Sequence, residues 1–130
     1  MSGAQAQAAA MRAAFERIEE AYEFMLAYAA QGRAGEGAEE GGGIRAYLAR
    51  FAEGLDQMEA ALAPGLAGDA GGAFARRVAD DIATARAALA ILCARPAISS
   101  AMVDNTNALL AVRALLTDIF FLDQVALAPR

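Results

Sequence analysis

Histidine, lysine and tryptophan are absent from this chain of 130 residues, and cysteine occurs once, at Cys93. Without histidine, the chain lacks the usual general base and the commonest metal ligand. Without lysine, it lacks the amine that forms Schiff bases, and a single cysteine excludes an internal disulfide or a cysteine-built zinc site. Most catalytic constellations therefore cannot be assembled. We expect no enzyme, with no catalytic residue, no cofactor and no metal.

Basic charge is also scarce. Eleven arginines stand against sixteen acidic residues, which gives a formal net charge of -5. Such a chain lacks the positive surface that holds a phosphate backbone. The pair Arg76 and Arg77 is followed by Asp80 and Asp81, a spacing typical of a solvated helix face. We therefore expect no binding to nucleic acid.

No apolar run is long enough to span a bilayer. The most apolar stretch, 108–122, is too short and is interrupted by Arg113 and Asp118. The N-terminal hydrophobic positions are periodic rather than continuous, unlike those of a secretory signal. We expect a cytoplasmic protein without membrane contact. Cys93 fits a reducing compartment, either as a small buried side chain or, beside Arg95, as a reactive thiolate.

Alanine supplies much of the 58% hydrophobic content, and alanine is the best helix former. Apolar residues recur at steps of three and four, which predicts amphipathic helices. The predicted helices span about 5–31, 44–63, 73–94 and, from an N-cap at Ser99 or Ser100, to about 126. No strand signal or repeat accompanies them. Residues 1–130 are therefore expected to form one all-α domain, a four-helix bundle of up-down-up-down topology.

The segment 32–43 is the clearest break in this pattern. It is rich in glycine and glutamate, a composition that ends helices and favours a flexible loop. Twelve residues is long for a connection between bundle helices. The segment is thus either a flexible spacer or a loop that folds over another part of the molecule.

The last predicted helix carries the most informative polar residues. They are Asp104, Asn105, Asn107, Arg113 and Asp118. Asparagine is a poor interior helix residue, and Arg113 lies at helical spacing from several leucines, which predicts a buried guanidinium that needs a partner. The group is either a structural polar network that fixes helix register or dimer geometry, or a site where Arg113 binds an anionic group.

Aromatic residues point to an interface. Phe24 and Tyr28 in the late part of the first helix, and Phe120 and Phe121 in the last, lie where the polar face nearly vanishes, so another chain is expected to cover them. We expect a non-enzymatic interaction or accessory protein, either a homo-oligomer, most simply a homodimer, or a binder of a partner protein. The alternative is a bundle that holds a small apolar or aromatic ligand between its helices. No motif resembles a known family.

Overall fold

The computed structural model describes residues 2–37 and 43–126, and within these ranges all regular structure is helical. Five α-helices occur there: α1 (Gly3–Ala29), α2 (Ile44–Leu62), α3 (Gly68–Cys93), α4 (Ser100–Ala108) and α5 (Leu110–Phe121). A π-helical turn, η1 (Leu122–Ala126), follows α5. The prediction of an all-α protein is confirmed. In these two ranges, none of the helices combines the length and the hydropathy that a bilayer span requires.

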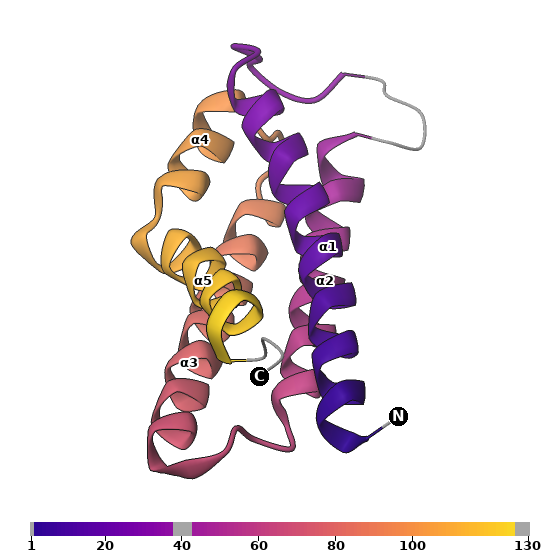
Figure 1. Ribbon diagram of the computed structural model, residues 1–130. Coiled ribbons are helices and arrows are strands. Elements are labelled where there is room, and N and C mark those ends of the chain that lie inside the picture. The colour runs from indigo at the N-terminus through magenta and orange to yellow at the C-terminus, as the bar shows by residue number, and fades with distance from the viewer. Residues whose placement is uncertain (1, 38–42, 127–130) are drawn as a thin grey trace.

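The helices pack around one apolar core. α1 and α2 lie side by side, α2 also contacts α3, α4 covers the end of α1, and α5 packs along α3 (Figure 1). The largest fully buried side chains are Tyr28, Phe51, Ile18, Met25, Ile44, Leu48, Leu55, Met58, Ile82, Ile98, Leu115 and Ile119. Because most of them occupy the predicted apolar stripes, the helical periodicity identifies much of the core from the sequence.

The contact between α1 and α2 depends on a glycine. Gly54 is buried, and a Cβ atom at this position would lie 2.6 Å from Cγ1 of Ile18. The missing side chain therefore lets the two helices approach closely. On the solvent side, Arg17 pairs with Glu53 at 2.7 Å, and Arg50 pairs with Glu20 at 3.4 Å.

The last predicted helix is interrupted. α4 ends at Ala108, and Leu109 adopts an extended conformation with φ −56° and ψ 130° before α5 begins. Just before the break, Asn105 donates its side-chain amide to the carbonyl of Ala101, and Thr106 donates its hydroxyl to the carbonyl of Met102. Such side-chain bonds compete with regular helix geometry. The single continuous helix expected here is therefore wrong.

The other helix boundaries shift by a few residues. α1 begins at Gly3, because Ser2 and Gln5 form a reciprocal capping box. α3 begins at Gly68 rather than near residue 73, so part of the expected glycine-rich turn is helical. Gly68 itself has a φ of +78°, a left-handed conformation that favours glycine. Asp69 in the first turn interacts favourably with the positive end of the helix dipole.

The described part of the segment 32–43 is fastened to the rest of the molecule. The backbone amide of Ser100 donates to the carbonyl of Arg33 at 2.9 Å, and the amide of Arg33 donates to Oγ of Ser100 at 2.8 Å. The carboxylate of Glu36 accepts from the amide of Ile98 at 2.6 Å. Residues 33–36 thus pack over the turn between α3 and α4 and do not act as a free spacer, whereas residues 38–42 lie outside the described part of the chain.

Candidate binding groove between α3 and α4

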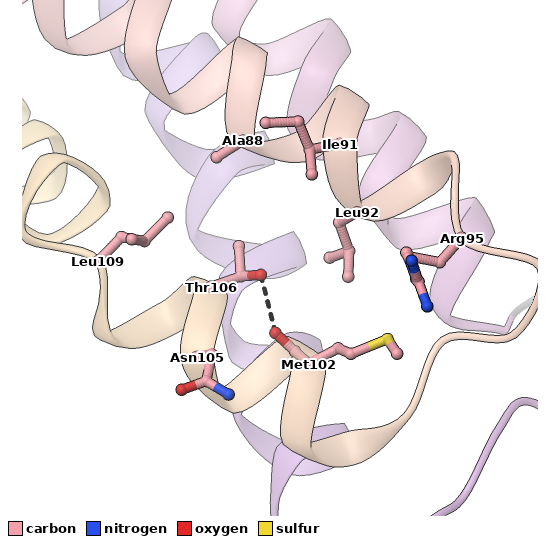
Figure 2. Close-up of a pocket in the computed structure, with 8 residues that line it drawn as sticks. All are labelled: Ala88, Ile91, Leu92, Arg95, Met102, Asn105, Thr106 and Leu109. Atoms are coloured by element: carbon pink, nitrogen blue, oxygen red, sulfur yellow. Dashed lines mark hydrogen bonds between the residues drawn. The ribbon is translucent and has the colours of Figure 1, made fainter.

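An apolar groove opens between the C-terminal half of α3 and α4. Its volume is about 310 Å³, near the lower limit for small-molecule sites. The lining residues are Ala88, Ile91, Leu92, Arg95, Met102, Asn105, Thr106 and Leu109 (Figure 2). Arg95 is the only charged residue among them. The groove therefore offers apolar contact along its length and one positive charge at the end where α3 passes into the turn.

Helical spacing explains the α3 wall. Ala88, Ile91 and Leu92 are separated by steps of three and one residues, so they follow one face of α3, and Arg95 follows two residues after the end of the helix. Leu92 is buried at 5% exposure, whereas Ile91 is 71% exposed, the highest value among the exposed large apolar side chains of the described residues. Ile91 thus forms a ridge beside the hollow.

The α4 wall depends on a defined helix start. Ser99 is the N-cap of α4, as predicted, and its Oγ accepts a hydrogen bond from the amide of Met102 at 3.1 Å. From Met102, steps of three and four bring Asn105, Thr106 and Leu109 to the side of α4 that lines the groove toward α3 (Figure 2). Leu109 is 43% exposed and lies at the break between α4 and α5.

Hydrogen bonds from α1 and α2 fix the angle between the two walls. Arg45 of α2 donates to the carbonyls of Cys93 at 3.0 Å and Arg95 at 2.8 Å, which satisfies free carbonyl groups at the end of α3. The hydroxyl of Tyr28 donates to the carbonyl of Ile98 at 2.6 Å. The groove is therefore shaped by contacts outside its own lining.

Glu36 completes this support. Its carboxylate accepts from the backbone amide of Ile98 and from Nε of Arg45, both at 2.6 Å. Backbone hydrogen bonds, above all the one from Ile98, together with the guanidinium of Arg45, lower the pKa of Glu36 from 4.5 to about 2. No local pattern indicates this contact, because the glycine- and glutamate-rich composition around Glu36 is typical of a flexible loop.

The expected polar group of the last helix is split by the structure. Asp104 and Asn105 are exposed, and Asn105 lies at the rim of the groove. Asn107 is buried at 6% exposure, and its amide has no hydrogen-bond partner among the described residues. Arg113 is exposed, so the prediction of a buried guanidinium is wrong. The helix break changes which face Arg113 occupies relative to the residues before Leu109.

The expected aromatic residues lie at opposite ends of the molecule. Phe24 stacks on Tyr47 with a centroid distance of 3.9 Å, and Tyr28 is buried at 1% exposure beside Ile98. Phe120 and Phe121 are 57% and 45% exposed, and Phe121 packs against Phe74 at 5.1 Å. The structure does not combine these four residues into one surface.

Three large apolar residues near Phe120 and Phe121 are covered by the chain itself. Leu115, Ile119 and Leu122 are at most 2% exposed. They belong to the apolar core of this single chain, so burying them does not require a second chain. Phe120 and Phe121, in contrast, stay exposed on the single chain.

Asp118 is paired with an acid that sequence reasoning missed. Asp81 of α3 is only 5% exposed, so its assignment to a solvated face is wrong. Burial, then the adjacent Asp81 carboxyl through hydrogen bonding and like-charge repulsion, raises the pKa of Asp118 from 3.8 to about 7. Asp81 lies at helical spacing between Val78 and Ala85 of the apolar stripe, and this position in the sequence indicates that the residue is buried.

Cys93 is also placed differently from its first interpretation. The thiol-bearing residue is exposed at the end of α3, not buried.

Comparisons of the chain with protein-family models, with curated proteins and with solved structures gave no match. Function is therefore inferred from the geometry of the groove and its surroundings.

Proposed function

We propose that this protein is a non-enzymatic interaction protein that forms a homodimer through the groove between α3 and α4. In this proposal its helices make a bundle of up-down-up-down topology, with α4 and α5 together in the position of the fourth helix. The observation that carries the proposal is the exposed side chain of Ile91 beside an apolar hollow. A surface with both a ridge and a hollow can be complementary to a second copy of itself.

Charge favours contact between the grooves of two copies over contact between their other surfaces. The protein carries a formal net charge of -5, so two copies repel each other over most orientations. The groove lacks acidic lining residues, and its only charged residue is Arg95. A two-fold axis through the middle of the groove would place the two Arg95 side chains at opposite ends of the interface. Contact between the grooves therefore brings two nearly neutral apolar surfaces together.

Small residues beside the groove permit close approach. Helical spacing places Ala87 and Ala94 next to Ile91, and Ala101 and Ala108 next to Asn105, and all four alanines are exposed. A stable dimer buries about 800 Å² on each partner. That area is roughly a ninth of the 7318 Å² surface of the chain. The outer faces of α3 and α4, rather than the groove alone, would supply it.

Light scattering coupled to size-exclusion chromatography tests the proposal. We expect the wild-type protein to be a dimer at micromolar concentration and Ile91→Glu to be a monomer, because burying a carboxylate in an apolar interface costs free energy and removes the apolar contact of Ile91. Leu26→Glu is the matched control, since Leu26 is 47% exposed on α1, away from the groove lining. This variant should stay dimeric, and both variants should keep the helical circular dichroism of the wild type.

A monomeric wild-type protein overturns the homodimer. The alternative is then a small apolar ligand with an anionic group facing Arg95, which the groove volume favours. Native mass spectrometry would in that case detect a bound molecule of low mass in the wild type and lose it in Ile91→Glu. Dimers of equal strength in the wild type and Ile91→Glu would place the interface elsewhere on the surface.

A further inference from the structure

Two acidic side chains interact electrostatically where α3 and α5 pack together. Asp81 of α3 is 5% exposed, and Asp118 of α5 is partly buried. The Oδ2 atoms of both residues are buried without a hydrogen-bond donor among the described residues. Two carboxylates in such surroundings cannot both stay ionised at low cost, because desolvation and repulsion act on the same pair. A proton held between them removes both penalties.

Within residues 2–37 and 43–126, no cation neutralises the pair fully. Nε of Arg77 lies 3.4 Å from Oδ2 of Asp81, an ion-pair distance without the alignment of a hydrogen bond, and the Arg77 side chain is 63% exposed. Of the other charged groups on the neighbouring elements, Arg113 of α5 and Asp104 of α4 are exposed. Asp123 of η1 is paired with Arg12 of α1 at 2.9 Å. Arg77 is thus the cation that acts on the pair, and water screens it.

We propose that Asp81 and Asp118 share one proton and form a pH-sensitive contact that holds α5 against α3. Loss of the proton leaves two negative charges within the interface and favours local opening of α5. Opening exposes Val112, Leu115 and Ile119, which are at most 2% exposed in the packed state. The contact is independent of the proposed dimer, because neither acid lines the groove.

The composition of the chain makes the titration of this acid pair easy to distinguish from that of other groups. Burial and the neighbouring acid raise the pKa of Asp118 to about 7, well above the 3.8 expected in the unfolded chain. No histidine is present to titrate in the same range. Between these two pKa values the folded protein binds more protons than the unfolded one, so stability decreases as pH rises. Above the folded pKa the loss is complete and the curve levels off.

Urea unfolding between pH 5.5 and 7.5 tests the inference. In the wild type, the unfolding equilibrium constant should increase with pH by up to about tenfold per unit, the limit for one proton. Asp118→Asn should abolish this slope and unfold at a higher urea concentration than the wild type at pH 7.5, because the amide can donate to Asp81 without charge. Asp80→Asn is the matched control: Asp80 is exposed on α3, next to Asp81 in the sequence, so this variant should keep the wild-type slope.

A flat wild-type curve over this range overturns the inference without any variant. So does a slope that persists in Asp118→Asn. Asp81→Asn removes the same pair from the other helix and should also flatten the curve, which protects the test against a misfolded Asp118 variant.

Hydrogen exchange, corrected for intrinsic rates, should show the loss of protection above pH 7 in α5 before α2. Equal loss in both helices would assign the slope to global unfolding rather than to this interface.

Discussion

Asn107 is a polar residue inside an apolar core. It is 6% exposed, and neither atom of its side-chain amide has a hydrogen-bond partner among the described residues. Burying an amide without partners costs about 1–3 kcal/mol. Replacement by leucine, whose side chain has the same number of heavy atoms and the same branch at Cγ, should therefore raise the free energy of unfolding by about 1–2 kcal/mol.

Chemical denaturation of Asn107→Leu measures this gain. Asn105→Leu is the control, because Asn105 is exposed and its amide already donates to the carbonyl of Ala101. Its effect should stay within about 0.5 kcal/mol. If Asn107→Leu is destabilised instead, the amide has a structural role that an apolar side chain cannot replace.

Arg113 illustrates how a residue's environment depends on the backbone that carries it. A continuous helix would place its guanidinium against leucines, but the break at Leu109 leaves Arg113 exposed. Arg113→Ala should therefore change the free energy of unfolding by less than about 0.5 kcal/mol, as is usual for exposed positions. A loss of several kcal/mol in a thermal or urea melt would show that the side chain is buried in solution.

At the level of elements, the crossing of α1 and α2 depends on Gly54. Alanine at an interior helix position usually stabilises by about 1 kcal/mol relative to glycine. At residue 54 the new methyl group would lie 2.6 Å from Cγ1 of Ile18. Overpacking of this kind costs about 1–3 kcal/mol, so we expect Gly54→Ala to lower stability overall.

Gly72 provides the comparison for this prediction. It lies in α3, and the nearest heavy atom to an added Cβ would be 3.8 Å away, in the flexible side chain of Arg76. Gly72→Ala should therefore raise the thermal melting temperature, whereas Gly54→Ala should lower it. If both substitutions stabilise the protein, α1 and α2 can separate enough to admit the methyl group.

The sequence predicts helices better than the contacts between them. Apolar periodicity identifies the helical stretches and most of the core, because burial on one face leaves a local pattern. The break at Leu109 has no glycine or proline to mark it. The charge of Asp81 favours a solvated face, although the residue lies at the spacing of the apolar stripe and is buried. The support of the groove by Arg45 joins residues about fifty positions apart, and no local pattern encodes such a bond.

The candidate site was predictable only in part. The sequence predicts Asn105 as a site residue, and Asn105 lies at the rim of the groove, whereas no sequence pattern marks Ile91 and Arg95 as site residues. Ile91 lies off the apolar stripe of α3, and a lone exposed apolar residue carries little information until its neighbours are known. Its significance comes from the position of α4, which depends on the turn between the two helices.

For the whole molecule, two acids with opposite pKa shifts determine how stability depends on pH. Glu36 has a pKa lowered to about 2, chiefly by the amide of Ile98, so its contribution is complete above 4.5 and is lost as pH falls toward 2. Asp118 has a raised pKa, so stability also falls as pH rises from about 4 to 7. Maximum stability should therefore lie at about pH 4, midway between the two unfolded-chain pKa values and lower than is common for proteins.

Urea midpoints measured from pH 2.5 to 8 at low protein concentration locate this maximum. Glu36→Gln removes the charge that accepts from Ile98 and Arg45, so it should lower the midpoint at pH 5 and flatten the acid side of the profile while leaving the neutral side unchanged. Glu19→Gln, on the exposed face of α1, should leave both sides unchanged. An acid side that is equally steep in Glu36→Gln would show that other carboxylates govern acid unfolding, and the fastening of residues 33–36 would then contribute little to stability.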